Sequence, residues 1–341
     1  MPVEYRKLGK SGLRVSVPIL GCMSFGSSEW ADWVLNEPEA LPIFKKAYDL
    51  GITTWDTANM YSNGQSEVIV GAAMKKYNIP REELIIMTKC FNLVDKTSFK
   101  RVDASKAQGR QFVNQSGLSR AAIFNQVNDS LKRLGTDYID VLQIHRYDNS
   151  VEPEEIMCAL NDLVRSGKVR YLGASSMWGY QFTTLQHVAE KNGWAKFISM
   201  QDHYNLLYRE EEREVIPYCN MTGVGLIPWS PLARGHLARP LSAVSIRKES
   251  LKSNPTINEQ ANEPATIEII NRVEKIAKDK SWLMSDVALA WVMGKVTSPI
   301  VGVNSVERLD QIASANGKSL TPDEVKFLEE PYVPRKIMGH R

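Results

Sequence analysis

The sequence contains few cysteines and lacks the motifs that usually gather a metal ion. Among its 341 residues are four cysteines, and no two of them form a C-x-x-C pair. The five histidines form neither an H-x-x-x-H nor an H-E-x-x-H pair. Scattered thiols of this kind are typical of a reducing compartment. We therefore expect neither a disulfide framework nor a metal site.

Long apolar segments and concentrated basic charge are also missing. No stretch approaches the roughly 18 apolar residues of a membrane span, and the N-terminal MPVEYRKLGKSGLRV lacks the apolar part of a signal peptide. The formal net charge is +3, and no run of Lys or Arg is interleaved with aromatics. These absences argue against membrane and nucleic-acid partners and favour a cytoplasmic protein that acts on a small molecule.

Two common nucleotide-binding motifs are absent as well. No strand-like run is followed by G-x-G-x-x-G, and the G-V-G at 223–225 precedes a strand instead of following one. The G-K-S at 9–11 is no P-loop, because Glu4 occupies the place of its first glycine. An open, doubly wound dinucleotide-binding sheet is therefore the less favoured alternative.

What the chain does contain is a regular alternation of short apolar runs and amphipathic segments. Its 43% hydrophobic and 24% charged residues describe an ordinary globular protein. Eight successive strand–helix units predict a (β/α)₈ TIM barrel that spans 1–341 as a single α/β domain. The apolar runs lie at 15–21, 53–58, 84–90, 138–145, 169–175, 197–204, 224–230 and 298–303.

Three segments lie outside this alternation. The opening YRKLGKSGLRVS predicts a β-hairpin, with its turn at 10–12, that closes the bottom of the barrel. The stretches 91–118 and 236–263 are longer than tight connectors. Both follow predicted strands, so we expect them on the C-terminal face, where barrel enzymes build their active sites. For the second stretch, a simple surface insertion is the alternative.

Four polar residues fall at or just beyond the ends of predicted strands: Asp56, Tyr61, Lys89 and His145. A tyrosine can protonate a carbonyl oxygen, but its pKa of about 10 calls for a partner that stabilises the phenolate. An ammonium about 4 Å away contributes about 4 kcal/mol at an effective dielectric of about 20. Lys89 is the predicted partner, and we expect its charge to bring the pKa of the phenol into a working range. Asp56 would hold Lys89 charged, and a neutral His145 would orient the substrate oxygen. Each residue also has a structural interpretation, as a loop, surface or capping residue.

Several segments, in order, resemble the aldo-keto reductase family. The resemblance to its aryl-alcohol dehydrogenase and versiconal hemiacetal acetate reductase branch rests on GCMSFGSSEW and the long loops. The segments that resemble the family as a whole are WDTANMYSNGQSE, MTKC, LQIHRYD, GASS, MQDHYNLLYREEE, PWSPLARG and PIVGVNSVERLDQ.

The resemblance implies a barrel that holds NADP(H) at its mouth, without a metal or a Rossmann domain. Tyr61 would be the general acid, with Lys89, Asp56 and His145 in the roles given above. In the cofactor site, Ser175 and Gln201 would hold the carboxamide and Trp229 would stack on the nicotinamide. The loop Ser230–Gly235, including Leu232, would pass over the pyrophosphate, and Asn304, Arg308 and Gln311 would lie near the adenosine 2′-phosphate.

Three residues depart from the family pattern. Ser176 replaces an asparagine, Asp202 replaces an asparagine next to Gln201, and Ser62 replaces the glycine that often follows the catalytic tyrosine. The first two changes alter contacts expected near the cofactor. The third is expected to tilt the loop after Tyr61.

A group of large side chains is predicted in loops that follow strands. Met23, Trp30, Trp33 and Trp178 are candidates to line a wide pocket for aromatic or polyketide-like carbonyl substrates. The alternative is that they pack beneath their own loops. The sequence also leaves two other functions open. One is an NADPH-binding regulatory subunit, as in the potassium-channel β subunits that resemble this family, and the other is a Schiff-base aldolase that uses Lys89.

Overall fold

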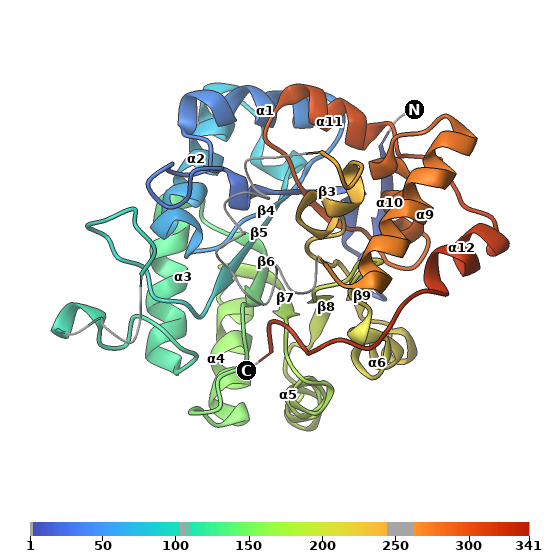
Figure 1. Cartoon of the computed structure of the whole chain (residues 1–341). Coiled ribbons are helices and arrows are strands. Elements are labelled where there is room, and N and C mark those ends of the chain that lie inside the picture. Colours follow the sequence, from blue (N-terminus) through green and yellow to red (C-terminus); the bar gives the residue numbers. More distant parts are fainter. Residues whose placement is uncertain (1–2, 103–106, 108, 244–261, 341) are drawn as a thin grey trace.

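A closed ring of parallel strands forms the centre of the molecule (Figure 1). The structure is a computed structural model that describes residues 3–102, 107, 109–243 and 262–340. Neighbouring strands follow the order β10-β3-β4-β5-β6-β7-β8-β9, and a parallel bridge from Trp229 to Ile300 joins the two ends. The predicted (β/α)₈ barrel is therefore confirmed. The strands are β3 (Ile19–Gly21), β4 (Thr54–Asp56), β5 (Ile85–Cys90), β6 (Ile139–Ile144), β7 (Val169–Ser175), β8 (Phe197–Gln201), β9 (Gly225–Leu226) and β10 (Ile300–Gly302).

The helices surround this ring and cover the outer faces of the strands (Figure 1). In α4 the buried apolar stripe includes Ile156, Leu160 and Leu163, all fully buried. The helices are α1 (Glu37–Asp49), α2 (Gln65–Lys76), α3 (Arg120–Leu134), α4 (Pro153–Arg165), α5 (Gly179–Asn192), α6 (Val215–Thr222), α9 (Pro264–Lys280), α10 (Met284–Met293), α11 (Val306–Ala313) and α12 (Pro322–Glu329).

Alternation along each strand separates the two sides of the barrel wall. In β4, Trp55 points outward, where its ring lies 4.8 Å from that of Phe44 in α1. The next residue, Asp56, points inward and meets side chains from β5, β6 and β8. Successive side chains of a strand take opposite faces, so one strand supplies both core packing and a site residue.

The N-terminal hairpin closes one end of the barrel, as predicted. Its strands, β1 (Glu4–Lys7) and β2 (Arg14–Val17), pair antiparallel. Leu8 is fully buried in an apolar cluster with residues of the barrel strands, including Met87 and Val141. Gly9 has φ +61°, and a Cβ added there would lie 2.3 Å from the Gly223 carbonyl oxygen, so the hairpin turn packs directly on backbone.

One strand prediction needs correction. The apolar run at 15–21 forms two strands instead of one, because Pro18 interrupts it and cannot donate a backbone hydrogen bond. Its first half belongs to the hairpin, and its second half begins the barrel.

Both long connections follow barrel strands, after β5 and β9. The first contains a short 3₁₀ helix, η4 (Arg110–Phe112). Parts of the predicted loops 91–118 and 236–263, at 103–106, 108 and 244–261, lie outside the described residues. Within the described part of the chain, no helix is both long enough and apolar enough to cross a membrane.

Candidate active site

The four predicted catalytic residues meet at the C-terminal end of the barrel. Asp56 ends β4, Lys89 lies near the end of β5, and Tyr61 opens the 3₁₀ helix η2 (Tyr61–Gly64). The Lys89 Nζ is 2.6 Å from Asp56 Oδ2 and 3.4 Å from Tyr61 Oη, and it also donates to the Thr57 carbonyl oxygen at 2.8 Å. Lys89 is fully buried, so these contacts fix the position of its charge.

The second oxygen of Asp56 is also occupied. Gln143 Nε2 donates to Oδ1 at 2.8 Å, and Gln201 Nε2 donates to the same atom at 3.0 Å. Gln201 Nε2 lies 2.7 Å from Gln143 Oε1 as well. A buried carboxylate with all these donors is immobile, which keeps Lys89 in place.

Burial and charge act in opposite directions on the two proton-carrying groups. Burial raises the pKa of the Tyr61 phenol, and the positive charge of Lys89 only partly offsets this. We expected Lys89 to prevail, but desolvation is the larger effect here, so the phenol keeps its proton near neutral pH. Burial would lower the pKa of Lys89, yet Asp56 and Tyr61 outweigh it and raise the pKa. The ammonium therefore stays charged.

His145 follows β6 directly and lies beside Tyr61, with ring centroids 5.9 Å apart in an edge-on arrangement. Its Nδ1 lies 3.2 Å from Asn92 Nδ2. An amide nitrogen can only donate, so Nδ1 is the acceptor, and in a neutral ring the proton is then on Nε2. His145 is thus arranged to donate a hydrogen bond from Nε2.

Next to this set, Trp229 takes part in a stack of rings. Its ring is stacked on His203 at 4.2 Å, and His203 is stacked on Tyr208 at 4.4 Å. Trp229 Nε1 donates to Ser176 Oγ at 3.1 Å. The stack and this hydrogen bond fix the indole plane at the barrel mouth.

The two residues predicted to hold the carboxamide, Ser175 and Gln201, contact each other. Ser175, the last residue of β7, donates from Oγ to the Gln201 carbonyl oxygen at 2.8 Å. The amide nitrogen of Gln201 is directed to Asp56 and Gln143. A carboxamide contact by these residues stays a prediction.

Three arginines gather near the loop after β9. The loop contains the 3₁₀ helix η6 (Ala233–Ala238), and a Cβ added at Gly235 would lie 3.7 Å from Arg239 Nη2. Burial lowers the pKa of Arg239, and the positive charge of Arg308 lowers it further. Burial also lowers the pKa of Arg234. Like charges brought together in this way favour the binding of a polyanion.

The remaining predicted cofactor residues are located in the same region. Ser230 and Leu232 precede η6, and the Ser230 carbonyl oxygen accepts from Asn205 Nδ2 at 2.9 Å. Arg308 and Gln311 lie on the exposed face of α11, and Asn304 is exposed just before that helix.

The three departures from the family pattern have visible consequences. Ser62 adopts φ +48°, where a glycine would be unstrained, and its Oγ accepts a hydrogen bond from the Ser27 backbone nitrogen. Ser176 also has a positive φ, and its backbone nitrogen donates to Asp202 Oδ1 at 2.7 Å. Burial raises the pKa of Asp202 well above its ordinary range, and the nearby charge of Glu211 adds to the shift.

The predicted substrate residues differ in exposure. Trp30 is buried, with its ring 6.0 Å from that of Trp33 and Arg101 over its face. Trp178 is 37% exposed at the barrel mouth. Met23 lies in the 3₁₀ helix η1 (Cys22–Ser24) and is half-buried. Trp178 is therefore the candidate most open to a bound molecule, while Trp30 also packs within its own loop.

Some residues at the site were missed by sequence reasoning. Gln143 lies two residues before His145 on the same face of β6, so the period-two pattern of a strand could have identified it. His203, the stacking partner of Trp229, lies in the segment MQDHYNL, and that segment could have been searched for it. No sequence signal pairs Asn92 with His145, because loop geometry brings them together.

A large surface cavity lies elsewhere. It has a volume of about 940 Å³ and is lined by residues of β1, α10 and α12, among them Arg6, Trp291 and Glu329. None of the predicted site residues lines it. The cavity is therefore separate from the candidate site at the barrel mouth.

Comparison with known proteins agrees with this geometry. The chain matches the Aldo/keto reductase family over residues 19–332. It is 55% identical to an aldo-keto reductase of Fusarium vanettenii, over 99% of this chain and 93% of the relative. The chain belongs to the aldo-keto reductase family.

Within that family, the chain is similar to members of the predicted branch. It is 53% identical to versiconal hemiacetal acetate reductase of Aspergillus parasiticus, over 98% of both chains. It is also 53% identical to a Schizosaccharomyces pombe protein provisionally named an aryl-alcohol dehydrogenase, over 99% of this chain and 98% of the relative. The protein is thus an oxidoreductase of the aryl-alcohol dehydrogenase-like type, and the predicted branch is confirmed.

Proposed function

We propose that this protein reduces aldehyde or ketone carbonyls to alcohols with NADPH, and that Tyr61 is the general acid. The observation that carries the proposal is the contact of the buried Lys89 ammonium with both Asp56, at 2.6 Å, and the Tyr61 hydroxyl, at 3.4 Å. This arrangement supplies a proton donor together with a fixed positive charge next to it.

Each residue of the set has a role in proton transfer. Tyr61 Oη donates its proton to the carbonyl oxygen as negative charge develops there. Lys89 stabilises the phenolate that remains, and Asp56 holds Lys89 charged and oriented. His145 donates a hydrogen bond from Nε2 to the same substrate oxygen and so sets its angle. NADPH, when bound, supplies the hydride.

The arginines and Trp229 support the choice of cofactor. Arg239 and Arg308 concentrate positive charge beside α11, which suits the 2′-phosphate that distinguishes NADPH from NADH. Trp229 has a fixed indole plane, which suits stacking on the nicotinamide. Aromatic or polyketide-like carbonyls are the proposed substrates, with Trp178 at the mouth as one wall of their pocket.

The other two functions are less well supported. A Schiff-base lysine must lose its proton, whereas Asp56 and Tyr61 raise the pKa of Lys89. A purely regulatory subunit would have no need for a complete proton-transfer set. The relatives that match nearly the whole chain carry reductase and dehydrogenase names.

The proposal is tested by the oxidation of NADPH in the presence of aromatic, aliphatic and polyketide-like carbonyls. We expect turnover with at least one aromatic aldehyde and formation of the matching alcohol. Tight NADPH binding without turnover of any carbonyl would favour the regulatory function instead. Trapping of a substrate on Lys89 by borohydride would favour the aldolase.

A further inference from the structure

The C-terminal tail crosses the mouth of the barrel. After α12 it runs past β9 and β8 at one edge of the ring and ends between α4 and α5 in this view (Figure 1). Tyr332 Oη donates to Glu210 Oε1 at 2.6 Å, and the Met338 backbone nitrogen donates to Tyr208 Oη at 2.9 Å. The tail is therefore bound along its length and ends beside the candidate active site.

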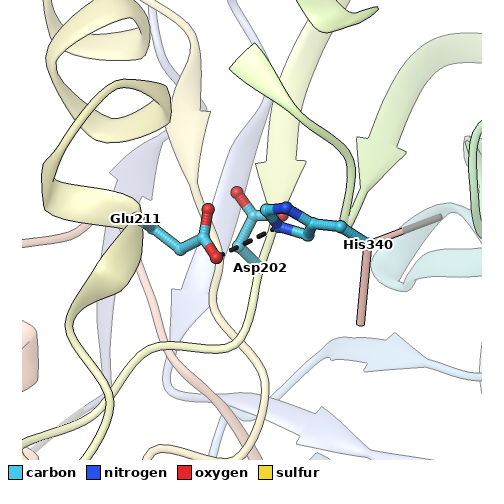
Figure 2. Close-up of side chains that lie close together, drawn as sticks. All are labelled: Asp202, Glu211 and His340. Atoms are coloured by element: carbon cyan, nitrogen blue, oxygen red, sulfur yellow. Dashed lines mark ion pairs between the residues drawn. The ribbon is translucent and has the colours of Figure 1, made fainter. Parts of the chain in front are cut away.

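At the end of the tail, His340 meets two acidic side chains. Asp202 follows β8 directly, Glu211 belongs to the 3₁₀ helix η5 (Glu210–Glu212), and all three side chains point toward one another (Figure 2). His340 Nε2 is 3.1 Å from Glu211 Oε1. One ligand atom from each residue lies within 4.8 Å of the other two.

Buried polar atoms of this cluster lack hydrogen-bond partners. Asp202 is 4% exposed and Glu211 is 2% exposed, and a single imidazole lies between them. Asp202 Oδ2 and His340 Nδ1 have no hydrogen-bond partner among the described residues. Buried polar atoms without a partner are costly in free energy, so the cluster is suited to a cation that these atoms can bind.

The donor set identifies the kind of cation. One imidazole nitrogen and two carboxylate oxygens suit Zn²⁺, whereas Ca²⁺ and Mg²⁺ prefer oxygen alone. Ligand atoms around a tetrahedral Zn²⁺ are about 3.4 Å apart, given metal–ligand distances of about 2.0–2.1 Å. His340 Nε2 and Glu211 Oε1 are 3.1 Å apart, and the three ligand atoms all lie within 4.8 Å of one another, which is close to that spacing.

From this geometry we infer that Asp202, Glu211 and His340 form a Zn²⁺ site that fastens the C-terminal tail across the barrel mouth. The fourth coordination position is filled by water. The ion connects the tail to Asp202, just after β8, and to η5, which already contacts the tail through Glu210 and Glu211.

Fastening the tail has a consequence for the active site, and this step rests on the proposed function. A Cβ added at Gly339 would lie 3.5 Å from Ser176 Cβ and 3.6 Å from Trp229 Cζ2. The tail thus packs against the ring that we propose to stack on the nicotinamide. Zn²⁺ is therefore an inhibitor that holds the tail over the cofactor site.

The site itself is tested by titrating Zn²⁺ into the full chain, without cofactor, in a calorimeter. We expect one ion per chain. His340→Gln and Asp202→Asn should each weaken binding by at least about tenfold, the lower end of what the loss of even an outer-shell partner costs. His187→Gln is the matched control, because it removes an imidazole from the exposed face of α5, away from the cluster. The absence of zinc binding, or equal binding by His340→Gln and His187→Gln, would overturn the inference.

The fastening of the tail is tested by trypsin, which needs no added metal, with mass spectrometry of the C-terminal fragment. Lys336 is exposed in the tail. Zn²⁺ should slow cleavage after Lys336 in the wild type and in His187→Gln, but not in His340→Gln. Equal cleavage rates with and without zinc in the wild type would contradict the fastening.

The inhibitory step is measured separately, as the effect of Zn²⁺ on carbonyl-dependent NADPH oxidation. Inhibition should be present in His187→Gln and lost in His340→Gln. Zinc that binds at the site without slowing turnover would refute the inhibitory step. A protein that binds zinc as expected but reduces no carbonyl would refute the proposed function and leave the metal site in place.

Discussion

Two buried aspartates on the same face of the barrel have opposite surroundings. Asp56, at the end of β4, pairs with the Lys89 ammonium through one oxygen and accepts from two glutamine amides through the other. Asp202, just after β8, accepts one backbone hydrogen bond, while its other oxygen has no partner among the described residues. The comparison distinguishes a completed network, in which both carboxylate oxygens have partners, from an incomplete cluster, in which one oxygen has none among the described residues.

The largest expected effect comes from removing the ammonium of Lys89 from the completed network. Lys89→Met should lower kcat for a good aldehyde by about a thousandfold, because an ammonium about 4 Å from the phenolate contributes about 4 kcal/mol at a dielectric of about 20. Lys275→Met, which removes an exposed ammonium in α9, is the control and should retain full activity. Near-normal turnover by Lys89→Met would refute the role of Lys89.

The two aspartates should also respond differently to substitution by asparagine. Asp56→Asn leaves the buried Lys89 uncompensated and should reduce the free energy of unfolding by about 3–5 kcal/mol. Asp202→Asn keeps an oxygen for the Ser176 amide, and because burial raises the pKa of Asp202 well above its ordinary range the change removes little charge, so stability should be close to that of the wild type in metal-free buffer. Urea denaturation of both variants measures the contrast. Equal losses would mean that Asp202 is as well compensated as Asp56.

A smaller effect is expected at the arginine cluster. Arg308→Ala should weaken NADPH binding by about 1.5–3 kcal/mol, the range of a hydrogen bond to a charged group, and should leave NADH binding almost unchanged. Higher salt should reduce the preference of the wild type for NADPH, since Arg308 is exposed. Fluorescence titration with both cofactors provides the measurement. Equal losses for NADPH and NADH would assign Arg308 a structural role.

The smallest effect concerns substrate size. Aromatic carbonyls should exceed propanal in kcat/KM by about 1–3 kcal/mol, because a filled apolar pocket contributes binding energy remote from the reacting carbonyl. A series of benzaldehydes and fused-ring ketones tests this. Equal kcat/KM across the series would mean that Trp30, Trp33 and Trp178 only pack the loops.

The sequence predicts the completed network far better than the incomplete cluster of Asp202, Glu211 and His340. The alternation of apolar runs and helices determines the barrel, and a barrel brings the ends of all its strands to one face. Asp56, Lys89 and His145 are strand-end residues, so their meeting follows from the fold. Gln143 was missed even though it shares a strand face with His145.

The incomplete cluster depends on the C-terminal tail, and barrel geometry does not determine where that segment lies. His340 lies in the tail, and its position beside Asp202 and Glu211 depends on tertiary hydrogen bonds such as that of Met338 to Tyr208. No motif spacing relates residues so far apart in the chain, which is why we expected no metal. The pKa of Tyr61 was misjudged for a similar reason, because burial cannot be measured from sequence.

The central claim is that Tyr61 donates the proton, and Tyr61→Phe tests it most directly. The substitution keeps the ring and removes only the hydroxyl, so NADPH affinity and thermal stability should match the wild type. Carbonyl reduction should fall by at least about a hundredfold, the lower end of general-acid effects. A variant that binds NADPH normally and still reduces an aromatic aldehyde at the wild-type rate would contradict the account.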